Sequence, residues 1–272
     1  MTRETLLVGC GKMGGAMLQG WIERGSDPAA ITIVEPMQEA AEQARGRFGV
    51  KAVGDGSELA DDYNPEIVIF AVKPQGLDEI APLYRRFAGA GTVFMSIAAG
   101  KPIGFFEQAL GDAAAIVRCM PNTPAAVRRG ITAACANGPV SDAQRALCQA
   151  LLEAVGEVVW VEDEALIDPV TALSGSGPAY VFLMIECMAE AGVAAGLPAD
   201  IAARLARATV AGSGELARQS IEPADQLRRN VTSPGGTTEA ALGVLMEDKD
   251  GLQQLMTRAL DAATRRSREL AG

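Results

Sequence analysis

Residues 9–14, GCGKMG, carry the glycine spacing of a dinucleotide-binding loop. They follow an apolar run at residues 5–8 and open a segment with helical periodicity, which is the context that such a loop requires. Gly9 would allow the tight turn, Gly11 would let the backbone approach a pyrophosphate, and Gly14 would let the helix pack closely on its strand. The amides at the helix N-terminus would then hold the anion. A glycine-rich connection without a ligand is the alternative.

An acidic residue stands where such loops place the partner of the adenosine ribose. Glu35 follows the second apolar run, 21 residues beyond Gly14. A carboxylate there typically accepts hydrogen bonds from the ribose hydroxyls of NAD, and it would repel the 2′-phosphate of NADP. No basic residue follows before Arg45. We therefore expect NADH to be favoured, with an exposed glutamate near a helix N-terminus as the alternative.

Three further segments are expected at the carboxyl ends of strands. Lys73 follows the apolar run at 67–72 and precedes Pro74, so it would place a cation over the cofactor crevice or be an ordinary solvated lysine. Small residues, Ala98 among them, follow the run at 92–97. Asn122 lies in a loop with two prolines, where it could reach the nicotinamide or form an Asx turn.

Two breaks rich in glycine and hydroxyl groups interrupt the helix-prone second half of the chain. They read SGSGP at 174–178 and SPGGTT at 233–238. Glycine costs about 1 kcal/mol and proline about 3 kcal/mol in a helix interior, so helices must stop at both. Each break would place backbone amides and hydroxyls at a helix N-terminus, an arrangement that suits a carboxylate. Ordinary caps and turns are the alternative.

The elements that position these residues differ between the two halves of the chain. In the first half, apolar runs alternate with helical segments, which predicts a mainly parallel sheet buried on both faces. The expected strands are 5–8, 31–34, 67–72, 92–97, 115–119, 131–134 and 158–161. The expected helices are 13–24, 37–48, 76–87, 103–110 and 143–155, followed by 165–173, 179–195, 199–218, 238–246 and 251–270 in the second half.

This pattern predicts two domains. We expect an α/β Rossmann-type dinucleotide-binding domain over residues 1–163 and an all-α substrate-binding and dimerisation domain over residues 164–272. The helix expected at 179–195 is apolar almost all round, so it must be buried. An oligomer interface is favoured, and the central helix of a monomeric bundle is the alternative.

Composition excludes several classes of protein. The chain has 272 residues, a net charge of −10 and no histidine, which argues against a nucleic-acid partner and against Ser-His-Asp chemistry. Its five cysteines stand singly, without metal-ligand spacing, so no metal is expected and a cytoplasmic location is favoured. Glu186 and Glu190 argue against a membrane span in the most apolar helix.

Taken together, the motifs resemble those of pyrroline-5-carboxylate reductases, which catalyse the last step of proline biosynthesis. The matching stretches are 9–14, 71–74, 120–124, 173–180 (LSGSGPAY) and 226–241 (QLRRNVTSPGGTTEAA). The resemblance implies reduction of the ring C=N bond of 1-pyrroline-5-carboxylate to L-proline with NADPH or NADH. It also implies a homodimer through the helical domain, which some members build into rings of dimers. Glu35-Pro36 departs from the serine, asparagine or arginine of many members, so NADPH preference is in doubt.

The resemblance also assigns site residues. The expected cofactor contacts are Gly9, Gly11, Lys12, Met13, Gly14, Glu35, Ala71, Val72, Lys73, Pro74, Ala98 and Asn122. The expected substrate contacts are Ser174, Gly175, Ser233, Gly235, Gly236, Thr237 and Thr238, with the amides of Gly236, Thr237 and Thr238 facing the carboxylate. Without a histidine, a proton relay would fall to Thr171, Thr238, Lys73 or solvent.

Two other functions remain open from the residues. A β-hydroxyacid-type dehydrogenase shares the expected two-domain plan, but that class uses a catalytic lysine in its helical domain. Here the only lysine beyond Lys101 is Lys249, in an acidic turn. A non-enzymatic NAD(H)-binding sensor is the other alternative, although it would have no use for the two glycine-rich breaks.

Overall fold

The computed structural model describes residues 4–89 and 91–271, and their contacts divide the chain into two compact units. Unit 1 comprises residues up to Gly175 and from Thr264 onward, and unit 2 comprises Ser176–Ala263. The expected domain boundary at residue 163 therefore differs from the division by contacts. The segment after it stays with unit 1 because Ile167 and Ala172 are buried there.

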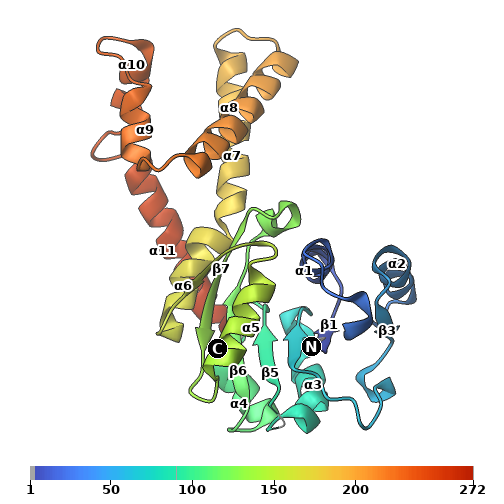
Figure 1. Cartoon of the computed structure of the whole chain (residues 1–272). Helices are drawn as coiled ribbons and strands as arrows, with labels where there is room; N and C mark the ends of the chain where they lie inside the picture. Colours follow the sequence, from blue (N-terminus) through green and yellow to red (C-terminus); the bar gives the residue numbers. More distant parts are fainter. Residues whose placement is uncertain (1–3, 90, 272) are drawn as a thin grey trace. The chain divides into compact units, whose positions relative to one another are not determined.

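Unit 1 contains one eight-stranded sheet with the order β3-β2-β1-β4-β5-β6-β7-β8 (Figure 1). The strands are β1 (Thr5–Val8), β2 (Ile31–Val34), β3 (Lys51–Val53), β4 (Ile67–Phe70), β5 (Val93–Ser96), β6 (Ala115–Met120), β7 (Gly130–Ala136) and β8 (Gly156–Trp160). All neighbours pair in parallel except β6 and β7. The chain order reverses between β1 and β4, which makes their carboxyl ends the expected ligand-binding edge. The predicted Rossmann-type sheet is confirmed.

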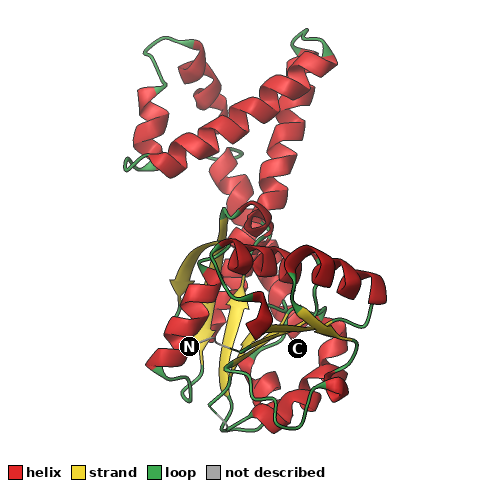
Figure 2. Cartoon of the chain, turned by 45° about the vertical axis from the view of Figure 1, so that its right-hand side comes forward, coloured by secondary structure: helices red, strands yellow, loops and turns green. Residues whose placement is uncertain are grey.

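Helices cover both faces of the sheet (Figure 2). On one face lie α1 (Lys12–Glu23), α2 (Gln38–Phe48) and α5 (Asp142–Leu152), which contribute Met17, Ala44 and Leu147, respectively, to the core. On the other face lie α3 (Leu77–Ile80), α4 (Ile103–Leu110) and α6 (Ile167–Val170), together with the 3₁₀ segment Ala81–Phe87. Because both faces are covered, β1, β2 and β4 are buried along their whole lengths.

The structure differs from the sequence expectation in three short segments of unit 1. The segment expected as one helix at 76–87 is broken into 3₁₀, α and 3₁₀ pieces, because Pro82 has no N–H to donate within it. The segment expected as a helix at 165–173 is a 3₁₀ turn, then α6, then a π-helical turn at Thr171–Gly175. The short strand β3 lacks the long apolar run that marks the others, and the sequence pattern missed it.

Unit 2 is built from helices. They are α7 (Gly177–Ala194), α8 (Ala199–Gln219), α9 (Ala224–Asn230), α10 (Thr237–Leu245) and α11 (Leu252–Ala271), the last of which ends in unit 1. Helices α7 and α8 pack side by side, and a Cβ on Gly192 would lie 3.2 Å from the Cβ of Ala202. The sequence pattern missed α9, a seven-residue helix with two arginines and no apolar stripe.

Helix α7 leaves many of its large apolar side chains exposed. None of its 18 residues is buried within the described part of the chain. The exposed residues include large apolar side chains such as Phe182, Leu183 and Met188. By length and composition alone, the stretch 164–194 is also the one candidate membrane span among the described residues. A helix this apolar must be covered by something other than the rest of this chain.

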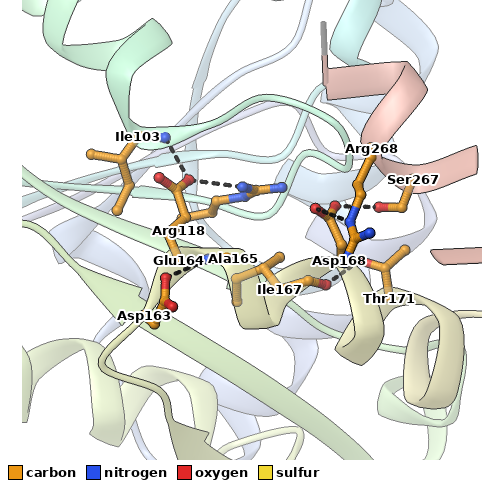
Figure 3. A network of polar contacts seen from close by, with 10 residues as sticks. All are labelled: Ile103, Arg118, Asp163, Glu164, Ala165, Ile167, Asp168, Thr171, Ser267 and Arg268. Carbon is orange, nitrogen blue, oxygen red and sulfur yellow. Dashed lines mark hydrogen bonds and ion pairs between the residues drawn. The ribbon is translucent and has the colours of Figure 1, made fainter. Parts of the chain in front are cut away.

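The segment that ends unit 1 is fixed to the sheet by polar contacts (Figure 3). The carboxylate of Glu164 accepts hydrogen bonds from the buried Arg118 guanidinium and from the Ile103 N–H, both at 2.7 Å. Four residues later, Asp168 accepts a 2.7 Å bond from the hydroxyl of Ser267 near the end of α11. The 163–175 segment is therefore attached to both β6 and the C-terminal helix.

Candidate active site

The parallel register brings the expected cofactor residues to one edge of the sheet. Gly9 N donates to Val34 O at 2.9 Å, and Ala71 N donates to Val8 O at 2.8 Å. Glu35 N donates to Val53 O at 2.9 Å. The ends of β1, β2 and β4 are thus direct neighbours, and the glycine loop lies between Glu35 and Ala71.

The three loop glycines have different reasons to be glycine. Gly9 has a φ of +90°, and a Cβ there would lie 2.7 Å from the Val72 side chain. A Cβ on Gly14 would lie 2.5 Å from Gly9 O, so α1 could not pack on β1. A Cβ on Gly11 would meet nothing within 4 Å, and its φ is an ordinary −69°. The chain itself does not require glycine at position 11, which fits a backbone approached closely by a pyrophosphate.

The Glu35 side chain is held by the loop that it was expected to flank. It is 7% exposed, its Oε2 accepts from Cys10 N at 2.9 Å, and its Oε1 accepts from Met37 N at 3.0 Å. Burial, and secondly the charge of Glu35, raise the pKa of the Cys10 thiol, which keeps that thiol protonated at neutral pH. The exposed-glutamate alternative is therefore wrong, and a negative charge is fixed beside the glycine loop.

Basic groups near the loop point to other partners or lie in solvent. Lys12 is exposed at the first turn of α1 and borders a cavity of about 310 Å³ between α1 and α2. Arg45 donates to Ala52 O at 2.8 Å, and Arg47 donates to the Gln19 side chain at 2.8 Å. Lys73 is exposed at the N-cap of the 3₁₀ turn that follows β4. Of the described residues, two basic side chains, Lys12 and Arg47, line this cavity together with Gly11. Arg47 is bonded to Gln19, which leaves Lys12 as the basic side chain that can turn toward a ligand.

Asn122 stands at the N-cap position of the 3₁₀ segment Thr123–Val127, but its side chain makes neither a capping bond nor an Asx turn. Its Oδ1 accepts from Ile131 N at 3.0 Å, and its Nδ2 donates to Ser174 O at 3.1 Å. Ser174 in turn donates its hydroxyl to Val170 O, and Thr171 donates its hydroxyl to Ile167 O at 2.7 Å. Thr171 therefore uses its proton within the helix, which leaves it only acceptor capacity for a relay. No pattern in the sequence predicts the Asn122–Ser174 contact.

In unit 2, the SPGGTT break forms the N-terminus of α10. Gly235 has a φ of +70°, and its N–H donates to the Glu239 carboxylate at 2.7 Å. Gly236 N donates to Ser233 O at 3.0 Å, so its amide is already used, contrary to the expectation that it faces a carboxylate. No side chain caps the helix at Gly236. The amides of Thr237 and Thr238 belong to this uncapped first turn, and they remain the expected anion donors.

The expected residues thus fall into two groups. The cofactor residues, Thr171, Ser174 and Gly175 belong to unit 1, and the SPGGTT residues belong to unit 2. Within unit 1, a Cβ on Gly175 would lie 2.5 Å from the Met120 side chain, so the MPNTP loop and the start of the SGSGP break are in direct contact. The individual contacts with cofactor and substrate stay predictions.

Comparison with known proteins agrees with this arrangement. The family model described as NADP oxidoreductase, coenzyme F420-dependent, matches residues 5–100, and the one described as pyrroline-5-carboxylate reductase dimerisation matches residues 164–270. Pyrroline-5-carboxylate reductases of Pseudomonas aeruginosa and Synechocystis are 40% and 42% identical to this chain over 271 residues. These alignments cover 99% of this chain and 97% and 99% of the two relatives.

Solved structures give the same result. A pyrroline-5-carboxylate reductase from Coxiella burnetii matches with a TM-score of 0.94 and 36% identity over 100% of both chains. The Plasmodium falciparum pyrroline carboxylate reductase, solved with NADP bound, matches with a TM-score of 0.82 and 28% identity over 99% of this chain and 98% of that one. The fold and the glycine loop define an NAD(P)-dependent oxidoreductase with a helical dimerisation domain. Within that class, the chain belongs to the pyrroline-5-carboxylate reductase family.

Proposed function

We propose that residues of unit 1 bind the cofactor, that the start of α10 binds the substrate carboxylate, and that the chain favours NADH. The chain reduces the ring C=N bond of 1-pyrroline-5-carboxylate to L-proline, the last step of proline biosynthesis. The observation that carries the cofactor half of this proposal is Gly11, where glycine serves no need of the fold. The β-hydroxyacid and sensor alternatives receive no support from the relatives.

The cofactor is held by unit 1. When bound, NAD(P)H supplies the hydride that passes from nicotinamide C4 to ring C5. The amides at the start of α1 bind the pyrophosphate over Gly11, and Glu35 accepts from the adenosine ribose hydroxyls. The residues after β4 and β5, including Val72, Lys73, Pro74 and Ala98, line the nicotinamide side. Their small or fixed side chains orient the ring and exclude water.

The substrate carboxylate is held by helix N-termini. In unit 2, the amides of Thr237 and Thr238 at the uncapped start of α10 donate to it, and the Thr238 hydroxyl lies beside them. Gly235 and Glu239 hold the loop in its turn, and Ser233 accepts from Gly236. The protonated imine is already a strong hydride acceptor. The nitrogen therefore needs only to keep its proton, and Thr238, Lys73 or solvent serves that role more readily than Thr171.

NADH is the favoured cofactor of this chain. The two backbone bonds fix the Glu35 charge where a 2′-phosphate would lie, and Arg45 and Arg47 are directed to Ala52 and Gln19. This supports the preference, because a phosphate there would meet a carboxylate while both arginines are bonded to other groups. Lys12 is the group that could weaken the effect.

A second copy of the chain is the partner that α7 requires. The match to a dimerisation domain indicates a homo-oligomer, and we infer that α7 is covered in a dimer, with rings of dimers as a further level. Light scattering at micromolar concentration should give at least twice the chain's 28.2 kDa, and an active monomer would contradict it. Action on a small metabolite also fits the expected cytoplasmic location.

The reaction is tested by incubating the purified protein with 1-pyrroline-5-carboxylate and either NADH or NADPH. Oxidation of the nicotinamide should occur with 1-pyrroline-5-carboxylate and yield proline. The matched control is the reverse assay, NAD⁺ with 3-hydroxyisobutyrate, which is the substrate type of the β-hydroxyacid alternative and should give no turnover. Turnover of the hydroxyacid without turnover of the imine would contradict the proposal.

A further inference from the structure

Two asparagines close the two ends of the antiparallel pair β6·β7. The register pairs Met120 with Ala133 at one end and Val117 with Ala136 at the other. Continued outward, it places Asn122 opposite Ile131 and Asn137 opposite Ile116. Each asparagine accepts the N–H of the residue opposite to it, at 3.0 Å from Ile131 and 2.8 Å from Ile116. The two asparagine side chains therefore make equivalent hydrogen bonds at the two ends of the β6·β7 pair.

The amide nitrogens of these asparagines reach different places. Asn137 Nδ2 donates to Ala114 O and to the Glu107 side chain, at the amino end of β6, away from the cofactor edge. Asn122 Nδ2 donates to Ser174 O, in the π-helical turn that ends unit 1. Of these two asparagines, Asn122 is therefore the one that connects the carboxyl end of β6 with a segment expected to contact substrate.

In the described part of the chain, few other side-chain hydrogen bonds connect the end of that π-helical turn to the sheet. Glu164 and Asp168 fix the segment further back, through Arg118 and Ser267. The hydroxyls of Thr171 and Ser174 bond back to carbonyls of their own helix, so they do not tie it to the sheet. Among the described residues, the Asn122 bond to Ser174 O is the last polar contact between this turn and the sheet before unit 2 begins. The Met120 side chain adds an apolar contact at Gly175.

We infer that Asn122 is a positioning residue for hydride transfer: it fixes Ser174 and Gly175 against the carboxyl end of β6. Its amide oxygen and its amide nitrogen each bond to the backbone, and the role assigned to it is to hold this turn, in place of the nicotinamide contact expected from sequence. π-Helical turns are frequent at functional sites, and a misplacement of about 1 Å can slow a reaction about a hundredfold. This inference rests on the proposed function.

The test compares Asn122→Asp with Asn137→Asp. Each aspartate can still accept the strand N–H, and each loses the donation from Nδ2. Both variants should lose stability, seen as a lower melting temperature. Asn122→Asp should lower kcat about tenfold to a hundredfold with KM for NADH unchanged within about twofold. The primary isotope effect with NADH deuterated at C4 should rise, because hydride transfer becomes the slow step. Asn137→Asp should keep the wild-type kcat and isotope effect.

Several outcomes would overturn the inference. Equal loss of kcat in both variants would make Asn122 an ordinary ribbon residue, and a weaker NADH affinity with unchanged kcat would make it a cofactor ligand. If Asn122→Asp does not fold, Asn122→Ser, which adds no charge, must show the same kcat loss and isotope effect. Failure of the wild-type chain to reduce 1-pyrroline-5-carboxylate is a separate result, since it refutes the proposed function before any variant is compared.

Discussion

At the residue scale, the structure separates positions that the fold requires from positions that a ligand requires. Gly9 and Gly14 have atoms of the chain within 3 Å of where a Cβ would stand, whereas Gly11 has none within 4 Å. The motif predicts these separate roles from the sequence, and the distances in the structure agree with them. Glu35 shows the reverse case, because its position after β2 could be read from the sequence but its two backbone bonds, to Cys10 and Met37, could not.

The glycine loop gives the first prediction. Gly11→Ala should keep the fold, with a loss of less than about 1 kcal/mol at this N-cap position. It should weaken NADH binding about tenfold to a hundredfold, because the methyl group occupies the space of the pyrophosphate and charge-assisted hydrogen bonds are lost. Gly14→Ala is the matched variant, and its contact with Gly9 O should cost about 1–3 kcal/mol of stability. Melting curves and NADH fluorescence titrations measure both effects, and unchanged NADH affinity in Gly11→Ala would refute the assignment.

Glu35 gives the second prediction, on cofactor choice. The wild-type chain should have a kcat/KM about tenfold higher with NADH than with NADPH, since charge repulsion of a few kcal/mol is reduced by ions and solvent. Replacing Glu35 by Ser and Pro36 by Arg should move the ratio toward NADPH. Glu42→Ser removes an equal charge from the exposed face of α2 and should leave the ratio unchanged. A clear NADPH preference in the wild type would show that Glu35 does not govern the pocket.

At the element scale, regular hydrophobic patterns were predictable and short or irregular elements were not. Strands β1, β2, β4 and β5 are buried four-residue runs, and their signal in the sequence is strong. The strand β3 and the helix α9 carry no such pattern, because they bury little surface of their own. The π-helical turn at Thr171–Gly175 depends on contacts with Asn122 and Met120 that lie some 50 residues away, which local propensity does not encode.

The buried ion pair between Arg118 and Glu164 gives the third prediction. Arg118 is 6% exposed in its side chain, so removing its partner leaves a buried charge. Glu164→Ala should destabilise unit 1 by about 3 kcal/mol, at the low end for such pairs because Glu164 is 30% exposed. Glu164→Gln keeps an acceptor for Ile103 N and should lose less. Both tryptophans, Trp21 and Trp160, lie in unit 1, so their fluorescence in urea reports this loss directly, and equal stability of both variants would contradict it.

At the scale of the whole molecule, the residues expected to bind the cofactor and those expected to bind the substrate carboxylate lie in different units. The cofactor loop, Glu35 and Asn122 belong to the sheet domain, whereas SPGGTT and α7 belong to the helical one. The identity of the substrate could be inferred from sequence because two specific motifs lie in order along the chain. The sequence alone does not predict which backbone amides are available to bind the carboxylate, because the N–H groups of Gly235 and Gly236 already make hydrogen bonds inside the loop.

The most direct measurement of the central claim follows the hydride into the product. The wild-type chain is incubated with 1-pyrroline-5-carboxylate and NADH carrying deuterium at the transferred C4 position, and the amino acid formed is analysed by mass spectrometry and NMR. The account predicts L-proline with one deuterium, located at C5, and an equal amount of oxidised cofactor. Oxidation of NADH without labelled proline, or no reaction with the imine, would contradict it.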